Sequence, residues 1–538
     1  MTLRQLAFRA AAREKLLAGA QQLADAVRLT LGPKSKSVLI QRKWGAPIVC
    51  NDGVTIAKEL ELKDPVENLA VQVLRQAAER TGEMVGDGTS TSTVLAYGIY
   101  ADGARNVAAG AGAVDLKRGL DRATAAAVNA LRAISRPVAT RAEKAQVACV
   151  SAHNDAAVGE LIAGAMEKIG DDGMITVEES RTMETVLEVV PGLQFDQGFI
   201  SPYFVTDPAR SEVVLQDAFV LLCDRRIVAL DELLPLLEAV VKSGRPLLLV
   251  AEDLDGEALA TFVLNHVRGT VKGCAVKAPG YGERRKALLE DLATVTGAQV
   301  ISQDLGVKLE SVGLEVLGSA ARVIVDKDHT TLVGGGGDRA KVEARIQQVR
   351  HAIEQAKSDY DREKIEERAA KLGGGVAVIR VGAPTEAERK ARKDALDDAI
   401  SATRAAIAEG IVPGGGLALL RTIDAVAQQE QACEGDELTG IRILKRALEA
   451  PAREIAENSG VDGGVAVARM REGSGTYGLD AARNVYGDLM QAGIIDPTKV
   501  VRVALENAVS AASVLLMSEA TMTDLPAERG EPHPAEPL

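Results

Sequence analysis

Two stretches of this chain carry different apolar patterns, and together they restrict the folds that it can adopt. Residues 65–136 are mostly alanine-rich and helical in pattern. From about residue 172 to 330, short β-branched runs such as Met174–Val177 and Pro246–Val250 alternate with helical stretches such as 231–243. Such alternation is typical of a sheet covered by helices. The sequence therefore predicts a multidomain α/β protein with other parts that are mainly helical.

The length of the chain requires more than one hydrophobic core. Its 538 residues predict about three to four domains. Aromatic residues make up only 3%, so alanine, valine, leucine and isoleucine must fill the cores. The formal net charge of −13 disfavours a nucleic-acid partner, because nucleic acids are themselves polyanions.

Cysteine spacing and the lack of export or membrane signals favour a cytoplasmic protein. The five cysteines are far apart and form no CxxC pair, which argues against a zinc site or a disulfide framework. The N-terminus has no apolar signal core, and we find no uninterrupted apolar run of membrane length. We therefore expect a reducing compartment and no membrane partner.

Local patterns predict several further elements. A helix is expected over 8–30, followed by short strands at 38–40 and 47–49. The charge-dense segment 338–372 predicts a helical hairpin, with a coiled coil as the alternative. The tail 526–538 is polar and contains four prolines, which predicts disorder.

The segment from Gly86 to Thr93 has the composition of an anion site. Gly86 and Gly88 flank Asp87, and hydroxyl residues occupy all five positions from Thr89 to Thr93. Glycines let backbone N–H groups approach an anion, and the N-terminus of a following helix favours negative charge. Asp87 would repel a phosphate unless a hard cation such as Mg²⁺ lay between them. A glycine turn with a threonine-rich helix cap explains the pattern equally well, so both interpretations stay open.

The common nucleotide motifs are absent or weak. GxxxxGK[ST] does not occur, which removes the commonest ATP-binding loop. A GxGxxG occurs at Gly473–Gly478, but residues 467–472 before it have a helical pattern rather than that of a strand. A nicotinamide oxidoreductase is therefore a remote alternative, and a plain turn is favoured. Other glycine turns carry acids, as in Asp52-Gly53, but spacing alone does not show that these turns converge.

A set of longer motifs gives a close resemblance to a known family. The motifs are Thr30-Leu-Gly-Pro-Lys34, Asp52-Gly53-Val54, Gly86-Asp-Gly-Thr89, Asp115-Leu-Lys-Arg-Gly119, Val276-Lys-Ala-Pro-Gly280, Lys371-Leu-Gly-Gly-Gly-Val-Ala-Val378, Ala402-Thr-Arg-Ala-Ala406, Pro413–Leu417 and Asp496-Pro-Thr-Lys499. With them the sequence resembles a group I chaperonin of the bacterial GroEL type, from its N-terminus to about residue 525.

The resemblance implies three domains and two hinges. A mainly helical equatorial ATP-binding domain would combine 1–136 with 411–525. A small α+β intermediate domain would combine 137–190 with 376–410, and an α/β apical domain would occupy 191–375. The hinges would lie at Pro137 and Gly410, and at Gly192, Gly374 and Gly375, because glycine accepts large changes in φ and ψ.

By the same resemblance, the equatorial domain would bind ATP and Mg²⁺, with K⁺ as a further candidate cation. Asp87 would hold Mg²⁺, Asp398 would polarise the attacking water after a domain movement, and Asp52 would assist. Without the resemblance, Asp398 is better explained as part of a solvated helix face. The other ATP-binding residues would be Thr30, Leu31, Gly32, Pro33, Asn51, Gly88, Thr89, Ser90, Thr91, Gly415, Asp480, Ala481, Ala482 and Asp496.

The helical stretch at 231–241 carries more apolar residues than one buried stripe requires. Its two stripes are Leu233, Leu236 and Val240, and Leu234, Leu237 and Val241. One stripe can be core while the other is exposed for binding, although burial of both is the simpler structural interpretation. The family places the residues that bind proteins and the lid at Leu234, Leu237, Leu259, Val263 and Leu264, with Phe199, Tyr203 and Phe204 nearby.

The resemblance implies an ATPase that folds proteins in the cytoplasm. Its partners would be non-native polypeptides, a GroES-type co-chaperonin that acts as a lid, and copies of itself in two stacked seven-membered rings. ATP binding and the lid would turn the apolar apical face away and release the captured polypeptide into an enclosed chamber.

The chain also departs from the family pattern, and the departures define an alternative. They are Ser35-Lys36-Ser37 after the first motif, Asn51, Ser90, His153, Asp480, Gln197 in place of an arginine that often pairs with the acid at Glu386, and a proline-rich tail in place of Gly-Gly-Met. They favour, as the alternative, a divergent second copy that binds proteins but assembles rings weakly and lacks a full folding cycle.

Overall fold

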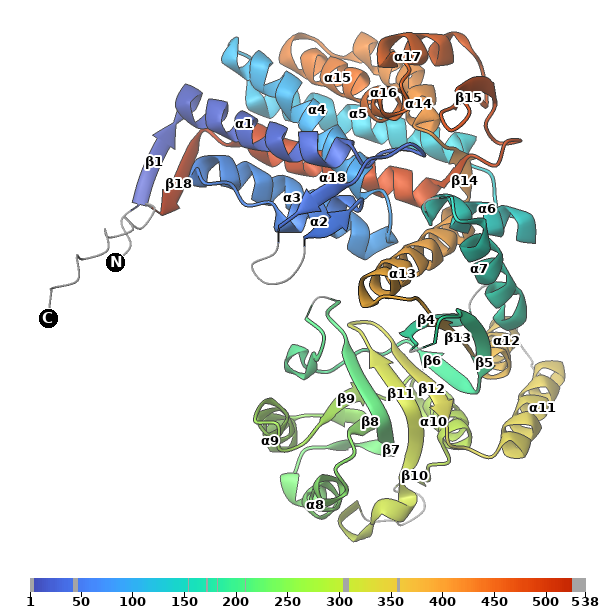
Figure 1. Ribbon diagram of the computed structural model, residues 1–538. Coiled ribbons are helices and arrows are strands. Elements are labelled where there is room, and N and C mark those ends of the chain that lie inside the picture. Colours follow the sequence, from blue (N-terminus) through green and yellow to red (C-terminus); the bar gives the residue numbers. More distant parts are fainter. Residues whose placement is uncertain are drawn as a thin grey trace, which may run out of the picture. The chain divides into compact units, whose positions relative to one another are not determined.

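The chain forms two compact units. The computed structural model describes residues 4–41, 47–152, 154–170, 173–180, 182–208, 210–302, 309–355 and 359–524 (Figure 1). Unit 1 combines Met1–Ala163 with Asp394–Leu538, and unit 2 is Gly164–Lys393. The finer division into equatorial, intermediate and apical domains stays a prediction.

Unit 1 is built mainly from helices. They are α1 (Arg9–Arg28), α2 (Gly53–Glu59), α3 (Pro65–Val85), α4 (Thr89–Ala108), α5 (Ala113–Ile134), α6 (Arg141–Ser151), α14 (Leu417–Gln428), α15 (Gly435–Ala447), α16 (Ala450–Asn458), α17 (Gly463–Glu472) and α18 (Thr498–Met517). Two more helices, α7 (Ala156–Ile169) and α13 (Glu386–Glu409), carry the chain across the boundaries between the units.

Short strand pairs complete unit 1. The antiparallel pairs are β1 (Arg4–Phe8) with β18 (Ala520–Asp524), β2 (Val38–Ile40) with β3 (Ile48–Cys50), β14 (Ile411–Pro413) with β17 (Ile495–Pro497), and β15 (Tyr477–Asp480) with β16 (Val485–Asp488). The helix expected over 8–30 is thus present as α1. The strand β1 before it was not predicted, because five residues without clear alternation give little signal.

The core of unit 1 is aliphatic, as the low aromatic content predicts. α18 packs against α3, α4 and α5, and buries Leu505, Val509 and Leu515 among them. Small residues let the helices approach closely. An ideal Cβ on Gly119 of α5 would lie 2.0 Å from the carbonyl oxygen of Glu437 on α15, so the crossing of these two helices requires glycine.

No uninterrupted apolar run of membrane length occurs in α18, because Lys499, Arg502 and Glu506 interrupt it. By length and composition this helix is long and apolar enough to cross a membrane. However, 67% of its most apolar window is buried inside the structure. A helix that is apolar on most of its surface is also expected at the centre of a large core, and that is where α18 lies.

Unit 2 has a seven-stranded mixed sheet with helices on its faces. Its strands are β6 (Gly192–Phe195), β7 (Val213–Ile227), β8 (Leu247–Leu254), β9 (Gly273–Lys277), β10 (Val300–Ile301), β11 (Gly318–Val325) and β12 (Thr330–Gly335). The strand order is β6-β12-β11-β7-β8-β9, with β10 paired to β7. The helices are α8 (Leu234–Ser243), α9 (Gly256–Val267), α10 (Gly282–Thr296), α11 (Arg339–Gln355) and α12 (Asp359–Gly374).

The topology determines which face each helix covers. β7, β8 and β9 are parallel and adjacent, so right-handed crossovers place α8 and α9 on the same face. The chain then returns to β10 beside β7, which reverses its direction along the sheet and places α10 on the other face (Figure 1). α11 and α12 pack together as the predicted helical hairpin.

A second, smaller sheet in unit 2 has the order β4-β13-β5. Its strands are β4 (Met174–Glu179), β5 (Val186–Val190) and β13 (Val376–Val381).

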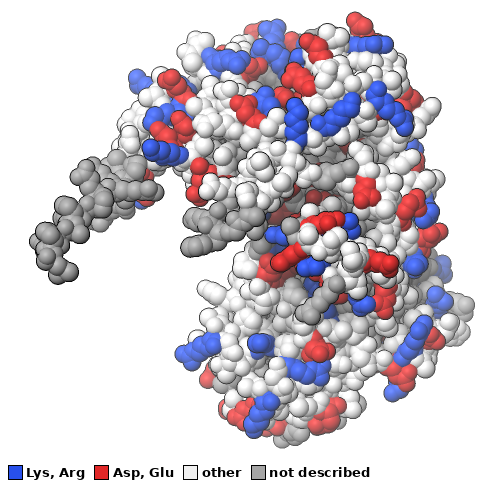
Figure 2. All heavy atoms as spheres, viewed as in Figure 1, with Lys and Arg blue, Asp and Glu red and all other residues white. Residues whose placement is uncertain are grey.

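On the face drawn in Figure 2, acidic and basic side chains are interspersed in both units instead of being separated by sign. This face therefore presents no large area of a single charge to a partner.

Candidate nucleotide site and binding surface

The hydroxyl of Ser90 marks the point in unit 1 where three turns meet. The hydroxyl oxygens of Thr30 and Ser90 are 2.8 Å apart. An ideal Cβ on Gly53 would lie 2.2 Å from Oγ of Ser90, so only glycine fits there. The turns that carry Thr30, Asp52 and Asp87 therefore converge, which their spacing in the sequence could not show.

The helix α13 brings a third acid to this place. Gly86 ends α3 with φ of 73°, and an ideal Cβ on it would lie 2.3 Å from Cβ of Ser401 and 3.6 Å from the carbonyl oxygen of Asp398. α13 therefore passes directly against the loop that carries Asp87. Nothing in the residue pattern around Ser401 indicates this contact.

Two of the acids gathered here have a raised pKa. Burial raises the pKa of Asp398 to about 9, and the charges of Asp87 and Asp52 act in the same direction. Burial likewise raises the pKa of Asp496 to about 7, with Asp87 adding to the effect. Carboxylates in this arrangement favour a proton or a cation among them, which is typical of functional sites.

The individual acids are also held by nearby donors. The carboxylate of Asp52 caps α2 by accepting from N of Thr55 at 3.0 Å and from Oγ1 of Thr55 at 2.6 Å. Oδ1 of Asp87 accepts from N of Gly88 at 2.5 Å. These bonds hold the two carboxylates at the starts of α2 and α4.

The loop after Asp87 opens α4 without a side-chain cap. Gly88, with φ of 80°, is the N-cap residue and makes no side-chain hydrogen bond to the helix. The N–H groups of the first turn are thus available to an anion. Within the hydroxyl run, Ser92 and Thr93 are fully buried while Ser90 and Thr91 are partly exposed. The threonine-rich cap is therefore not how this helix begins.

The turn after α1 is held in place by a side chain from α16. Nδ2 of Asn458 on α16 donates to the carbonyl oxygens of Arg28 at 2.8 Å and Leu31 at 3.0 Å. Gly32 adopts φ of 88°, in the left-handed region that favours glycine. Leu31 is buried and Pro33 is exposed. Asn458 was not identified from the sequence, because it lies in an ordinary helical pattern.

The strands β14 and β17 place the remaining predicted residues together. Asp496 pairs with Val412, and its Oδ1 lies 3.0 Å from an ideal Cβ on Gly414. An ideal Cβ on Gly415 would lie 3.9 Å from the carbonyl oxygen of Leu479, which directly precedes Asp480. Gly414 and Gly415 thus lie between the segment that carries Asp496 and the turn that carries Asp480.

The turn after Asp480 satisfies its own carboxylate. Oδ1 of Asp480 accepts from N of Ala482 at 3.0 Å and from N of Arg483 at 3.1 Å. Ala481 is buried, whereas Ala482 and Asn51 are exposed. An asparagine oxygen accepts the same two bonds, so replacement of the usual asparagine by Asp480 preserves this turn.

The donor set around Asp87 fits a hydrated Mg²⁺ ion. Within the described ranges, no group of three or more His, Cys, Asp or Glu side chains has an arrangement suited to a metal ion. Mg²⁺ needs only one or two carboxylates when phosphate oxygens and waters supply its other ligands. The negative charge that raises the pKa of Asp398 is what a cation at Asp87 would offset.

The two stripes of α8 differ in burial, as one of the interpretations expects. Leu233, just before α8, and Leu236 and Val240 are at most 1% exposed, whereas Leu234 is 43% and Val241 is 40% exposed. Leu237 is the exception in the second stripe, because it is only 6% exposed and belongs to the core of unit 2.

The helix α9 and the turn before β7 extend this surface. Leu264 and Val267 are exposed on α9, and Tyr203 is exposed beside it. The other predicted residues contribute less: Leu259, Val263 and Phe199 are partly buried against the core, and Phe204 is completely buried. We use "apical surface" below for Tyr203, Leu234, Val241, Leu264 and Val267.

Phe204 has a structural role in the core. Its ring lies 5.4 Å from that of Phe262 on α9, and at the same distance from the ring of His266. Such aromatic contacts stabilise a fold by about 0.5–1.5 kcal/mol beyond area burial. Phe204 thus positions α9, and it offers no surface to a partner in this conformation.

Comparison with known proteins decides the family. A model described as the TCP-1/cpn60 chaperonin family matches residues 23–526. The chain belongs to this chaperonin family. It is 68% identical over 531 residues to Chaperonin GroEL 5 of Bradyrhizobium diazoefficiens, which covers 99% of this chain and 98% of that protein. The resemblance inferred from the motifs is confirmed, and so is the multidomain α/β fold.

Membership gives this chaperonin a role in protein folding. GroEL-type chaperonins bind ATP, typically with Mg²⁺, and are generally ATPases of the bacterial cytoplasm. They work on polypeptides with a GroES-type co-chaperonin and as ring oligomers. The oxidoreductase alternative has no support in the fold, because Gly473–Gly478 follows α17 and leads into β15. A dinucleotide motif requires the reverse order, a strand followed by a helix.

The glycines expected at the hinges of this chaperonin lie where two chain segments touch. Gly410 has φ of 82°, and an ideal Cβ on it would lie 2.5 Å from the carbonyl oxygen of Arg136. Gly375 has φ of 64° and would place its Cβ 2.7 Å from the carbonyl oxygen of Val190. Gly192 and Gly374 are equally crowded by backbone. These contacts explain the glycines structurally, and their role as hinges stays a prediction.

Some departures from the chaperonin pattern lie outside the described residues, namely His153 and the tail 526–538. Among those described, Ser90 keeps its hydroxyl in contact with Thr30. Gln197 is held by its backbone, because its carbonyl oxygen accepts from Oγ1 of Thr330 at 2.6 Å.

Proposed function

We propose that this chain is an ATP-driven chaperonin of the cytoplasm that captures non-native polypeptides and folds them in a ring closed by a GroES-type lid. The observation that carries the proposal is the convergence of Asp52, Asp87 and Asp398 beside an uncapped helix N-terminus. Phosphoryl transfer to water needs anion donors, a metal-holding acid and an acid that orients the water. These residues supply all three.

In this proposal each part of the site has one task. The turns at Thr30–Pro33 and Gly88–Thr91 bind phosphate oxygens through backbone N–H and hydroxyl groups. Asp87 holds Mg²⁺, which would neutralise charge developing on the phosphate oxygens. Asp398 accepts a hydrogen bond from the attacking water and orients it, and Asp52 supports it from the start of α2. Asp496, Gly415 and the turn 480–482 face the nucleoside.

Hydrolysis depends on ionisation of Asp398, and this ionisation depends on a cation bound at Asp87. With a pKa of about 9, the carboxyl group of Asp398 is protonated near neutral pH and accepts poorly. A cation held by Asp87 lowers this pKa, because an opposite charge within a few ångströms favours the ionised form. The acid therefore becomes active when the site is filled.

The apical surface is proposed to capture polypeptides. Its five side chains are 40–70% exposed, and an exposed apolar patch of this kind marks a binding site. Burial of apolar area is not directional, so such a surface accepts many sequences. The proposed lid competes for the same residues and thereby displaces the captured chain.

Two strand pairs in unit 1 are proposed to join neighbouring copies into rings. β1 and β18 expose Leu6, Phe8 and Met522, and β2 and β3 expose Leu39 and Val49, all more than half exposed. A two-stranded sheet is marginally stable alone, and its open edges invite pairing with another chain. Contact between these two different patches is head-to-tail, and it gives a ring when the rotation between copies closes. The two seven-membered rings are taken from the family.

Ring assembly and refolding test this proposal together. Light scattering after size exclusion, with and without ATP and a GroES-type protein, should show an assembly many times the monomer mass. The same preparation should raise the yield of a refolding model enzyme only with ATP and the lid. A stable monomer under all conditions that still suppresses aggregation would contradict the ring cycle and favour the divergent copy with weak assembly.

A further inference from the structure

Unit 2 contains a cavity that is separate from the apical surface. It has a volume of about 390 Å³ and lies between α10, α12 and β6. Its apolar lining includes Leu193, Phe195, Leu288, Leu292, Ile365 and Leu372. Small-molecule sites have volumes of about 300–1,000 Å³, with mostly apolar walls and a few polar groups that orient the ligand. This cavity meets that description.

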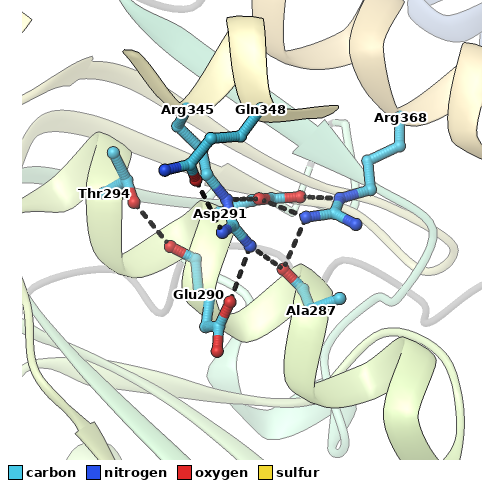
Figure 3. A network of polar contacts seen from close by, with 7 residues as sticks. All are labelled: Ala287, Glu290, Asp291, Thr294, Arg345, Gln348 and Arg368. Carbon is cyan, nitrogen blue, oxygen red and sulfur yellow. Dashed lines mark hydrogen bonds and ion pairs between the residues drawn. The ribbon is translucent and has the colours of Figure 1, made fainter. Parts of the chain in front are cut away.

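One wall of the cavity is fixed by a buried ionic network (Figure 3). Asp291 on α10, whose side chain is 1% exposed, accepts from Nε of Arg345 on α11 at 2.8 Å and from Nη2 of Arg368 on α12 at 2.8 Å. Nε of Arg368 binds the other carboxylate oxygen. A single buried acid thus ties both helices of the hairpin to α10, which makes this wall of the cavity rigid.

Most charges along the rim are already paired, but one is not. Lys371 pairs with Asp196 at 3.2 Å, and Glu283 pairs with Lys286 at 3.3 Å. Arg284, which also lines the cavity, has no ion pair or hydrogen bond within the described part of the chain. Uncompensated positive charge therefore stands beside an apolar cavity.

A second arginine adds a free donor. Figure 3 shows Arg368 with one terminal nitrogen turned away from Asp291 and without a dashed contact. The hydrogen bonds of Arg368 use Nε and Nη2 only, and Arg368 lines the cavity. The first turn of α10, with Glu283 and Arg284, also lies at the rim, and the positive end of a helix favours an anion.

We propose that this cavity binds a small amphipathic carboxylate, such as a medium-chain fatty acid. The hydrocarbon chain lies among the leucines between α10 and α12, and the carboxylate lies at Arg284 with Arg368 as a second donor. The one unpaired guanidinium matches a single negative charge. The inference stands independently of the ATP site, because every residue named belongs to unit 2.

Titration calorimetry on the full chain with straight-chain carboxylates from hexanoate to decanoate tests this inference. One molecule should bind per chain, and affinity should rise roughly fourfold for each added methylene until the cavity is full. Decanol, which has no charge, should bind more weakly than decanoate. No saturable binding, or binding only at micelle-forming concentrations, would overturn the inference.

Two variants test whether the carboxylate binds in this cavity. Arg284→Gln should weaken decanoate roughly fivefold, as for an exposed ion pair, and remove its advantage over decanol. Ala287→Phe, which fills the cavity, should abolish binding of both, provided that circular dichroism and the unfolding midpoint match the wild type. Arg268→Gln, an exposed arginine after α9, is the matched control and should change nothing. Binding that survives both Arg284→Gln and Ala287→Phe would lie elsewhere and would refute the inference.

Discussion

The candidate nucleotide site and the apical surface of this chaperonin each keep groups in an unfavourable environment, but of opposite kinds. The nucleotide site withdraws like charges from water, so that Asp398 has a pKa of about 9. The apical surface leaves apolar side chains such as Leu234 and Leu264 in water. In the proposed function binding relieves both, in the first case through oriented donors and cations and in the second through burial in any direction. The candidate nucleotide site is therefore expected to be specific for its ligand, and the apical surface to accept many sequences.

The largest effect is expected at the acid that links the turns of the nucleotide site. Asp87→Asn should lower turnover by on the order of 1,000-fold, because it removes the metal-holding charge at the reacting phosphate. Phosphate release at saturating ATP and Mg²⁺ measures this. The exposed Asp424→Asn on α14 is the control and should keep wild-type turnover. Turnover of Asp87→Asn near that of the control would remove the site from the proposal.

The two stripes of α8 should separate stability from binding. Leu236→Ala removes a fully buried side chain and should lower the free energy of unfolding by about 2–5 kcal/mol. Leu234→Ala should change it by no more than about 0.5 kcal/mol, while it weakens suppression of aggregation of an unfolded protein. Urea unfolding and light scattering measure the two effects. Equal destabilisation by both variants would show that both stripes are core.

The raised pKa of Asp398 predicts a pH dependence of stability. Between its ordinary value of 3.8 and about 9, the folded state holds a proton that the unfolded chain has lost. Stability of the nucleotide-free protein therefore falls as pH rises through this window, by at most about 1.4 kcal/mol per pH unit. Asp398→Asn cannot lose the proton, so its advantage in unfolding midpoint over wild type should grow from about pH 5.5 to pH 8. An advantage that is equal at both pH values would contradict the raised pKa.

A pair of glycines with the same backbone angle isolates the contact with α13. Gly86 and Gly244 both end helices with φ of 73°, but only Gly86 has a neighbour that a Cβ would strike, namely Ser401. Alanine should cost about 1–2 kcal/mol at either position through backbone strain. Gly86→Ala should cost about 1–3 kcal/mol more through overpacking, and it alone should slow hydrolysis. Equal effects on turnover would mean that α13 does not depend on this contact.

The apical surface could be predicted in part from its sequence. Periodicity identifies two apolar stripes on α8, because both belong to a single helix, but it does not tell which of them is exposed. Pattern did not reveal that Leu237 and Phe204 turn into the core, since their burial depends on neighbours that are remote in the sequence. The strand β1 and the core position of α18 were missed for the same reason.

The nucleotide site could not be assembled from the sequence without the family resemblance. Asp52, Asp87, Asp398 and Asp496 come from four separate segments, and their meeting depends on close approaches at Gly53 and Gly86. From composition alone, the loop at Asp87 was either an anion site or a glycine turn with a helix cap. The pattern around Asp398 indicated a solvated helix face. Asp398 is nevertheless buried, because α13 packs against turns that are remote in the sequence. Supporting residues such as Asn458 carry no local signal at all.

Hydrolysis and binding of ATP by Asp398→Ala, measured on one preparation, test the central claim most directly. Loss of the acid proposed to orient the water should slow single-turnover hydrolysis by at least about 100-fold, while the dissociation constant for ATP stays within a few-fold of wild type. Glu388→Gln, an acid near the start of the same helix, should hydrolyse ATP normally. Wild-type hydrolysis by Asp398→Ala would contradict the assignment of this acid and the proposed mechanism.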